Sequence, residues 1–462
     1  MKIAIFFLAT TMLAQTRIAS DFEMRQMEQQ VAHSSDFLSQ LSGHLNLGDL
    51  RMTRNETALA RAEYSKALEI AMNERLAARR ASAMTRYSTA TSYAALAAAK
   101  LGDAASAFAL SEEAIRYASD SAKSWNLYAT AMSAVHLPAK AASASRNAVM
   151  IAAHENDPLD LAIDQYTLAS SLIELNQNDE AEMLLFDVVS SLRSDRFASL
   201  RRDVEKSESF EIYSSARGEQ AAYISLLNRA QLRLARLDED RGDFAKAREQ
   251  YGNVLAARTD DPTALAAMAR LASTTEERER YYAQAFDANP FSPALIRDYQ
   301  KFLSVAAGPS AGRVPAGEPA PTQSTGEQVR LALQEMQRDQ LIAARKTIDN
   351  LLQQFPNNDT LQLLRGEIDE RRARGPLAIV ASSSPAELDK KIFTGQAIFS
   401  GGPPFETGTI DGAPFRFSEP TAFNGTFAAG VPLRLTYRIL GATQINGADG
   451  LLIEPLRLEH AQ

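Results

Sequence analysis

Apolar residues recur along most of this chain at the spacing of one face of an α-helix, and the pattern repeats at a fixed interval. Ala107 and Ala141 stand 34 residues apart, and the same interval separates Ala114 from Ala148. Further copies fill the region from about residue 41 to residue 372. Such a repeat predicts a series of helix pairs. No pair can bury its apolar face alone, so stability comes from stacking on neighbouring pairs.

The sizes of the repeated residues fit two antiparallel helices per copy. Only a small side chain fits where two helix axes come closest, and Ala129 takes such a position. Gly102 and Gly242 stand where the first helix of a pair must turn, and glycine tolerates the left-handed φ of such a turn. Pro290 and Pro356 end second helices, because proline cannot continue a helix. The large residues expected to fill the wedges between helices are Tyr64, Trp125, Tyr251 and Tyr282.

These residues and their spacing resemble the tetratricopeptide repeat family, whose unit is a helix–turn–helix of 34 residues. Trp125 falls on the tryptophan position of the family. The three small positions of the family are matched by Ala129, Ala141 and Ala148. The resemblance covers about residues 41–372, with gaps near 195–227 and 307–325. It implies a mainly α solenoid of helical hairpins that mediates protein–protein interaction.

Two stretches depart from the pattern. In the first copy about 13 extra residues are expected to lengthen the second helix, over Glu69–Arg86. Residues 195–227 match no repeat well and are read either as a degenerate helical unit or as a partner-binding insertion.

The first residues have the layout of a secretory signal peptide. Lys2 supplies one positive charge and an apolar stretch follows, too short to span a bilayer as a helix. A buried N-terminal helix or strand is the other reading. We expect an exported protein of the periplasm, the outer-membrane surface or the extracellular space, and association with the cell envelope is one of the open alternatives.

Beyond the repeats the composition changes twice. Residues 306–325 are rich in Pro, Gly and Ala and predict a linker. After Gly375, alternation of apolar and polar residues over Val431–Ile439 predicts a strand, with further strands at Lys391–Phe399 and Leu451–Leu458. We expect a small β module with exposed edge strands, which would dock on the solenoid or pair with another chain by strand addition.

These boundaries give a predicted organisation in five parts. They are a signal-like apolar segment (1–19), a solenoid (20–305), a linker (306–325), a short repeat unit plus helix (326–375) and a β-rich module (376–462).

Composition and charge remove several function classes. The net charge is −8, so the surplus of Lys and Arg that a nucleic-acid-binding protein needs is missing overall. The chain has no cysteine, which excludes thiol catalysis, Fe–S clusters and Cys-based zinc sites, and only 5 histidines. We therefore expect no cofactor, no metal and no small-molecule substrate.

Two motifs with apparent chemistry have simpler explanations. Gly308–Gly312 matches G-x-S-x-G, but it lies in the predicted linker and not between a strand and a helix. Asp238–Asp243 is faintly similar to a calcium loop, yet a helix end and the repeat turn account for these residues. We predict no catalytic residue and no metal site.

In this family, side chains at set positions of the first helix line the concave face. Carried over one repeat at a time, the resemblance implies a partner-binding groove lined by Asn126, Thr130, Ser133, Tyr166, Ser170, Glu174, Arg236, Glu239, Asp240 and Arg270. This lining is mixed and polar, without the Lys-rich character of a peptide carboxylate clamp. Each residue taken singly could be an ordinary solvated position, so the prediction concerns the surface as a whole.

Three functions follow as hypotheses. The first is a non-enzymatic exported scaffold that binds a protein partner or copies of itself. The second is a structural subunit of an extracellular filament or homopolymer, assembled through the β module and strand donation. The third, an enzyme, would need a catalytic cluster that the sequence does not display.

Overall fold

The computed structural model describes residues 21–155, 157–197, 218–306, 324–337, 341–374, 392–400, 405–411, 413–421, 430–445 and 448–460. The chain forms two compact units, Met1–Pro290 and Phe291–Gln462. The division falls before Pro293–Ala306, a helix that the sequence analysis assigned to the main solenoid.

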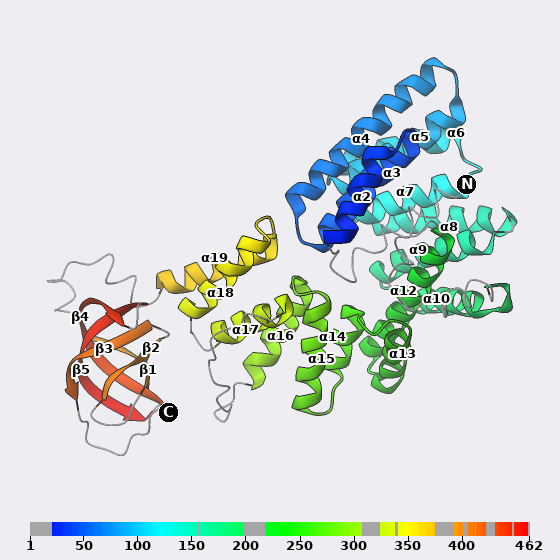
Figure 1. Ribbon diagram of the computed structural model, residues 1–462. Helices are drawn as coiled ribbons and strands as arrows, with labels where there is room; N and C mark the ends of the chain where they lie inside the picture. The colour runs from blue at the N-terminus through cyan, green and yellow to red at the C-terminus, as the bar shows by residue number, and fades with distance from the viewer. Residues whose placement is uncertain are drawn as a thin grey trace. The chain divides into compact units, whose positions relative to one another are not determined.

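Helical hairpins build the described part of the first unit (Figure 1). An initial helix, α2, is followed by six hairpins, whose first members we call A helices and whose second members we call B helices. The A helices are α3 (Phe37–Thr53), α5 (Met84–Lys100), α7 (Ala122–Ala134), α9 (Pro158–Glu174), α12 (Gly218–Arg241) and α14 (Pro262–Arg270). The B helices are α4 (Thr57–Arg80), α6 (Ala104–Tyr117), α8 (Pro138–Glu155), α10 (Asn178–Arg193), α13 (Phe244–Ala257) and α15 (Thr275–Ala288); α2 spans Asp21–His33 and a short 3-10 turn, η2, spans Asp195–Phe197.

The hairpins stack in the order of the sequence, as the repeat predicts. Helix α5 packs on α7, α7 on α9 and α9 on α12, and each A helix also packs on its own B helix. A residue with left-handed φ closes five of the six A-to-B turns. These residues are Asn55, Gly102, His136, Asn176 and Gly242. The turn role predicted for the two glycines is therefore confirmed.

The predicted packing positions are buried with one exception. Ala129, Ala141 and Ala148 are fully buried. Tyr64, Tyr251 and Tyr282 are each no more than 4% exposed. Trp125 is only half-buried, which corrects the expectation that it fills a wedge completely. Its ring stacks on Tyr128 at 6.0 Å between centroids, and its Nε1 donates to the Ser119 carbonyl at 2.9 Å.

Two helix boundaries differ from the predicted ones. Helix α4 is long, as expected, but it ends at Arg80 and not at Arg86, because Ser82 adopts a φ of 54° and turns the chain into α5. Helix α12 already begins at Gly218, so the last part of the unmatched stretch 195–227 belongs to a repeat. Residues 198–217 lie outside the described residues.

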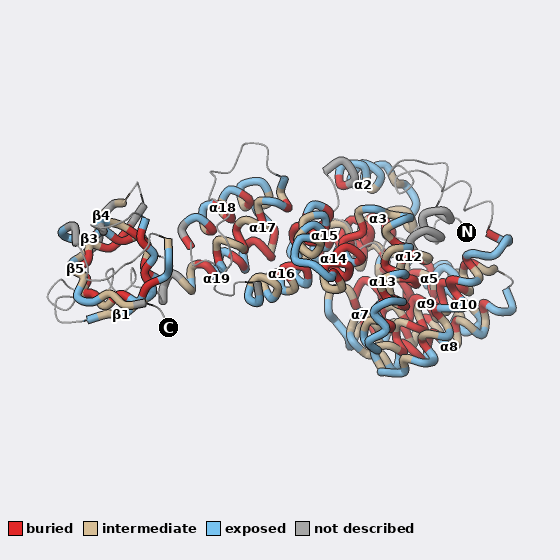
Figure 2. Tube along the Cα trace, turned by 90° about the horizontal axis from the view of Figure 1, so that it is seen from below, coloured by how far each residue is buried: buried red, intermediate tan, exposed pale blue. Residues whose placement is uncertain are grey.

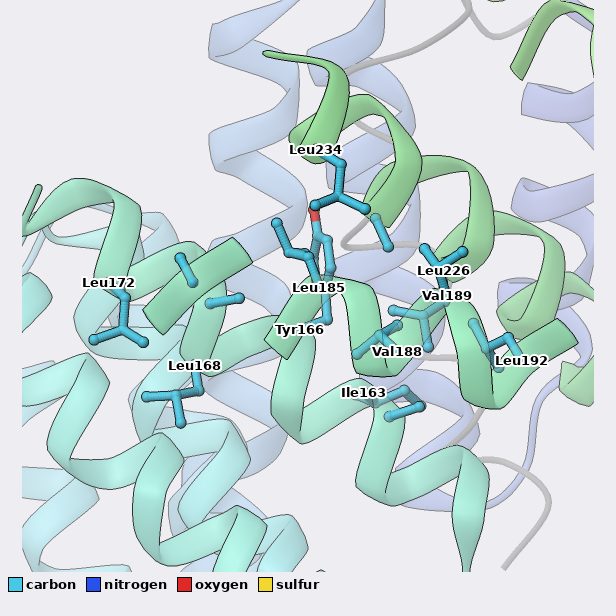
Figure 3. Packing of buried hydrophobic residues seen from close by; sticks show 14 of the residues in the cluster. Ile163, Tyr166, Leu168, Leu172, Leu185, Val188, Val189, Leu192, Leu226 and Leu234 are labelled. Carbon is cyan, nitrogen blue, oxygen red and sulfur yellow. The ribbon is translucent and has the colours of Figure 1, made fainter. Parts of the chain in front are cut away.

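The largest apolar cluster of this unit joins α9, α10 and α12 (Figure 3). Leu185, Val188 and Leu192 of α10 are fully buried between Ile163 of α9 and Leu226 of α12. Leucine and valine at helical spacing on three adjacent helices thus make one continuous core across two repeats.

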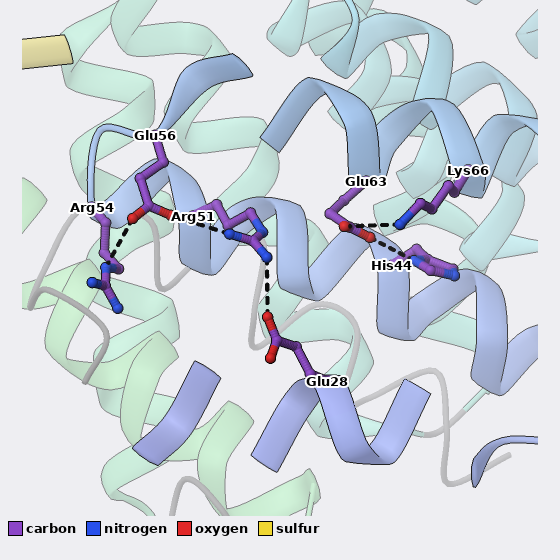
Figure 4. Close-up of polar contacts among 7 residues, drawn as sticks. All are labelled: Glu28, His44, Arg51, Arg54, Glu56, Glu63 and Lys66. Atoms are coloured by element: carbon purple, nitrogen blue, oxygen red, sulfur yellow. Dashed lines mark hydrogen bonds and ion pairs between the residues drawn. The ribbon is translucent and has the colours of Figure 1, made fainter. Parts of the chain in front are cut away.

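Ion pairs attach α2 to the first hairpin (Figure 4). Arg51 of α3 lies 3.0 Å from Glu28 of α2 and 3.3 Å from Glu56, which precedes α4. Nearby, Glu63 of α4 lies 2.7 Å from His44 of α3. These contacts use charged side chains where the apolar interface between the helices ends.

Four helices and a barrel form the described part of the second unit. Helix α16 packs on α17 although the predicted linker separates them in sequence, and Gln334 donates to the buried Tyr299 hydroxyl at 2.7 Å. The helices are α16 (Pro293–Ala306), α17 (Thr325–Gln337), α18 (Leu341–Gln354) and α19 (Asp359–Arg374).

The β module is a closed barrel, which overturns the prediction of exposed edge strands. Its strands are β1 (Ile392–Phe399), β2 (Phe405–Ile410), β3 (Ala413–Thr421), β4 (Pro432–Ile445) and β5 (Ala448–His460). The order is β1-β2-β3-β5-β4, and β4 pairs back with β1. One pair, β3 with β5, is parallel and the others are antiparallel, as in a five-stranded Greek-key barrel of the OB type. In the described part of the module each strand thus pairs with two neighbours over at least part of its length, and none is left as an edge strand.

Buried and exposed positions alternate around the barrel (Figure 2). The aromatic side chains Phe399, Phe415, Phe417 and Tyr437 point into the core. Outward positions of β4 and β5 carry charges that pair, such as Arg438 with Glu454 at 2.8 Å. The alternation predicted over Val431–Ile439 is therefore the inside–outside alternation of β4.

Candidate protein-interaction surface

The residues predicted to line a groove all lie on four A helices, α7, α9, α12 and α14. We call the side of these helices that carries them the inner row. Its members differ in exposure. Asn126 and Tyr166 are buried, at 2% and 5% exposed, whereas Glu174, Arg236 and Asp240 are exposed. The two buried residues therefore contribute mainly to the packing between helices, and their role in partner binding stays a prediction.

Side chains of the inner row join α7 to α9. The Asn126 amide donates to Asp164 at 2.5 Å and to the Thr167 hydroxyl at 3.3 Å. The Thr130 hydroxyl donates to the Asn126 side-chain oxygen at 3.5 Å. Further along, the Ser133 hydroxyl donates to Glu174 at 3.4 Å. Three of the predicted residues thus fix the spacing of two adjacent A helices.

Asp164 is a carboxyl group buried in this junction. Burial raises its pKa well above the usual value, and the charges of Asp160 and Glu155 act in the same direction, whereas the hydrogen bond from Asn126 opposes them. Burying an ionised carboxylate is costly, so this site favours the protonated form more than water does. No periodic pattern of the sequence indicates a buried polar residue at this position.

A second joint links α12 to α14. The Glu239 carboxylate accepts from two nitrogens of Arg270, at 2.9 and 3.0 Å, and from the Tyr251 hydroxyl at 2.9 Å. Burial alone would raise the pKa of Glu239, but the bonds and charge of Arg270 outweigh it and lower the pKa. On the exposed side Arg236 pairs with Asp240 at 3.1 Å.

The stretch that is faintly similar to a calcium loop is part of the same joint. Asp238 accepts a hydrogen bond from Gln250 at 2.9 Å, and its carbonyl accepts from the Asp243 amide. Among the residues that the structure describes, no group of three or more His, Cys, Asp or Glu side chains is placed to hold a metal ion. Within the same residues, no helix has the length and apolar character needed to cross a bilayer.

Between these joints, α9 faces an arginine pair on α12. The Arg229 guanidinium lies 5.7 Å from the centre of the Tyr166 ring, and Figure 3 shows the Tyr166 hydroxyl pointing toward α12. Burial by itself raises the pKa of Tyr166, yet the positive charges of Arg229 and Arg233 outweigh burial and lower it. Both arginines are half-buried. Within the described ranges, neither forms an ion pair with a carboxylate.

Sequence reasoning missed both arginines. It ended the unmatched stretch at residue 227 and began the next repeat copy at Leu234, so positions 229 and 233 were assigned to neither. The signal that could have found them is the spacing of Arg229, Arg233 and Arg236, which puts all three on one face of a helix.

A hollow of about 330 Å³ lies on the other side of α12, between α10 and α13. Val189 and Leu234 are among its apolar lining, Phe186 lies at its rim with 65% of its surface exposed, and Arg193 and Lys246 supply charges. The hollow is lined by the B helices α10 and α13 and by the A helix α12, and it was not predicted. It is a second, mixed surface, separate from the inner row.

Comparison with known proteins identifies no family. No family model matches the chain, and no curated protein matches it. Solved structures give likenesses at low identity. The apo form of the quorum sensor NprR from B. thuringiensis is 13% identical, covers 76% of this chain and 92% of its own, and has a TM-score of 0.38.

Two further structures have TM-scores that are no higher. BtubC (BKLC) from P. vanneervenii is 19% identical, covers 57% of this chain and 97% of its own, and has a TM-score of 0.33. The TPR domain of P58(IPK) is 14% identical, covers 71% and 78%, and has a TM-score of 0.19. At these scores the likeness carries no argument. The fold is instead evident from the chain's own geometry: a mainly α, TPR-type solenoid of helical hairpins with a small C-terminal β module.

Proposed function

We propose that the first unit is a non-enzymatic scaffold that binds a segment of a protein along the inner row. The observation that carries this proposal is the row itself. Four A helices present polar side chains on one side, and hydrogen bonds between neighbouring helices hold them at fixed spacing. A preorganised polar surface lowers the entropy cost of ordering side chains when a partner binds.

Two carboxylates of the first unit favour a binding role over a catalytic one. Glu239 of α12 is held by Arg270 and Tyr251, and Glu113 of the B helix α6 accepts from Arg75 and Tyr87. Carboxylates that are saturated with hydrogen-bond donors are stabilised as anions and make poor proton acceptors. These two carboxylates are thus engaged in joints between helices.

The experiment is site-specific photo-crosslinking in cells of the source organism. A photoreactive residue replaces Ser170 or Asp240 on the inner row, and Ser143, an exposed residue of the B helix α8, serves as the control position. We expect one crosslinked species in near-stoichiometric yield from both inner positions and none from position 143. Its mass tells whether the partner is a foreign protein or a second copy of this chain.

Equal crosslinking from all three positions, or from position 143 alone, would contradict the proposal. In that case binding would occur on the B helices, where the hollow next to Phe186 lies.

We also propose that the protein is exported through its N-terminal segment. The support is the charge and apolar run of residues 1–19; these residues lie outside the described part of the chain. Mass spectrometry of the protein isolated from its source tests this, because a cleaved signal leaves a new N-terminus near Gln15. An intact Met1 in protein recovered from the cytoplasm would refute export.

A further inference from the structure

We infer that the inner row takes an acidic segment of its partner, and that Arg229 and Arg233 of α12 are the residues that contact the carboxylates. This inference rests on the proposed function and adds to it the chemistry of the bound segment.

Three arginines place positive charge on one face of α12. Arg229, Arg233 and Arg236 follow one another along a single face of α12, and no acidic residue stands between Leu226 and Leu237. Arg229 lies against the Tyr166 ring of α9, which holds the guanidinium at the junction of two A helices. The face is therefore a short cationic stripe on an otherwise acidic protein.

Arg229 and Arg233 differ from the other arginines of the inner row in their ion pairs. The other two arginines of the inner row are paired with acids, Arg270 with Glu239 and Arg236 with Asp240. Within the described residues, Arg229 and Arg233 have no such ion pair. The carboxylate that acts on Arg229 from a distance belongs to Asp261, and it already accepts two backbone N–H groups at the start of α14.

A half-buried guanidinium has lost part of its hydration, and an unpaired charge in that position is costly. A carboxylate that docks against it restores the lost interactions, and the planar fork of arginine can bind a carboxylate through two parallel hydrogen bonds. These two sites therefore offer more binding free energy than exposed arginines do.

The charge around the stripe sets the class of partner. Asp240, one turn beyond Arg236 on α12, pairs with Arg236 at 3.1 Å and so ends the stripe. A long polyanion such as a nucleic acid would meet this carboxylate as well as the net charge of −8 on the chain. A protein segment with a few adjacent Asp or Glu residues fits a stripe of this length.

The test measures binding of two labelled peptides to the full-length protein by fluorescence anisotropy. One peptide carries four consecutive Glu residues in a Gly/Ser background, and the other has Gln in their place. We expect the Glu peptide to bind at least ten times more tightly than the Gln peptide, and to weaken as salt is raised because the contacts are ionic.

Variants assign the binding to the stripe. Arg229→Gln combined with Arg233→Gln should weaken the Glu peptide at least tenfold, and the corresponding lysine variant should bind with intermediate affinity because it keeps charge but loses the fork. Arg146→Gln with Arg241→Gln is the matched control, since both arginines are already paired with acids, and it should bind as the wild type does. Unchanged thermal melts show that each variant is folded.

Three results would overturn the inference: equal affinity for both peptides, no loss in the Arg229/Arg233 variant, or tighter binding of a labelled single-stranded oligonucleotide through the same arginines. The crosslinking experiment separates this failure from failure of the proposed function. If the inner positions still capture the partner in the Arg229→Gln, Arg233→Gln protein at full yield, the scaffold stands and the acidic segment does not.

Discussion

Single packing residues determine how closely neighbouring helices approach each other. Ala141 is fully buried, at 0% exposed, so Ala141→Leu should overpack the joint and lower the free energy of unfolding by about 1–3 kcal/mol.

Trp125 is half-buried but stacks on Tyr128, so Trp125→Ala should lower the free energy of unfolding by about 2–3 kcal/mol, less than the loss for a fully buried tryptophan. Thermal and denaturant melts measure both. No loss in either variant would mean that the helix register is wrong.

The turns between A and B helices give a second prediction at this scale. Gly102 and His136 hold equivalent left-handed positions, with φ of 85° and 58°. An L-residue pays about 1–2 kcal/mol for this conformation. Gly102→Ala should therefore destabilise the protein by about 1 kcal/mol, whereas His136→Gly should leave the melting temperature unchanged or raise it. A higher melting temperature for Gly102→Ala together with a lower one for His136→Gly would contradict the turn assignment.

Asp164 predicts a dependence on pH. Because burial raises its pKa in the folded state, stability is lost as pH rises above the pKa of the unfolded carboxyl, about 3.9. Asp164→Asn keeps an acceptor for Asn126 and never ionises. We expect the melting temperature of the variant to exceed that of the wild type by a margin that grows from pH 4 to pH 8. A margin that shrinks over this range would show that the carboxylate is stabilised as an anion.

At the scale of elements, one arginine adds a polar link between α2 and the first hairpin, beside the apolar contact of Met24 with Leu47. Arg51 joins Glu28 of α2 to Glu56, and its side chain is 16% exposed. Arg51→Ala should cost about 1–2 kcal/mol and release α2 before the hairpins. Hydrogen exchange by mass spectrometry should show faster exchange across Asp21–His33 and unchanged exchange in α7 and α9. Uniformly faster exchange would mean that α2 is part of the cooperative core.

The elements also show what the sequence can predict. Local spacing predicts the hairpins, their turns and the strand β4, because about fifteen consecutive residues are enough to define the apolar face of a helix or a strand. The start of α12 was missed because the repeat pattern is weak before Leu234. The closing of the barrel could not be predicted, since it depends on the pairing of β1 with β4 and of β3 with β5, which are distant in sequence.

In the candidate site, too, some features can be predicted from the local sequence and others depend on contacts between helices. The resemblance to the repeat family implies which side of each A helix carries the inner row, and Thr130, Ser170 and Asp240 stay predictions as contacts for a partner. Partnerships between helices, such as Asn126 with Asp164, depend on how neighbouring repeats are offset and are visible only in the structure.

At the scale of the whole molecule, we propose that the preorganised inner row on the A helices of the first unit binds an acidic segment of a partner. Hydrogen exchange of the full-length protein, with and without the crosslinked or purified partner, tests it most directly. We predict slower exchange on binding in α7, α9 and α12, strongest around Tyr166 and Arg229, with α8, α10 and the barrel unchanged. Slower exchange confined to the B helices around Phe186, or to the barrel strands, would contradict it.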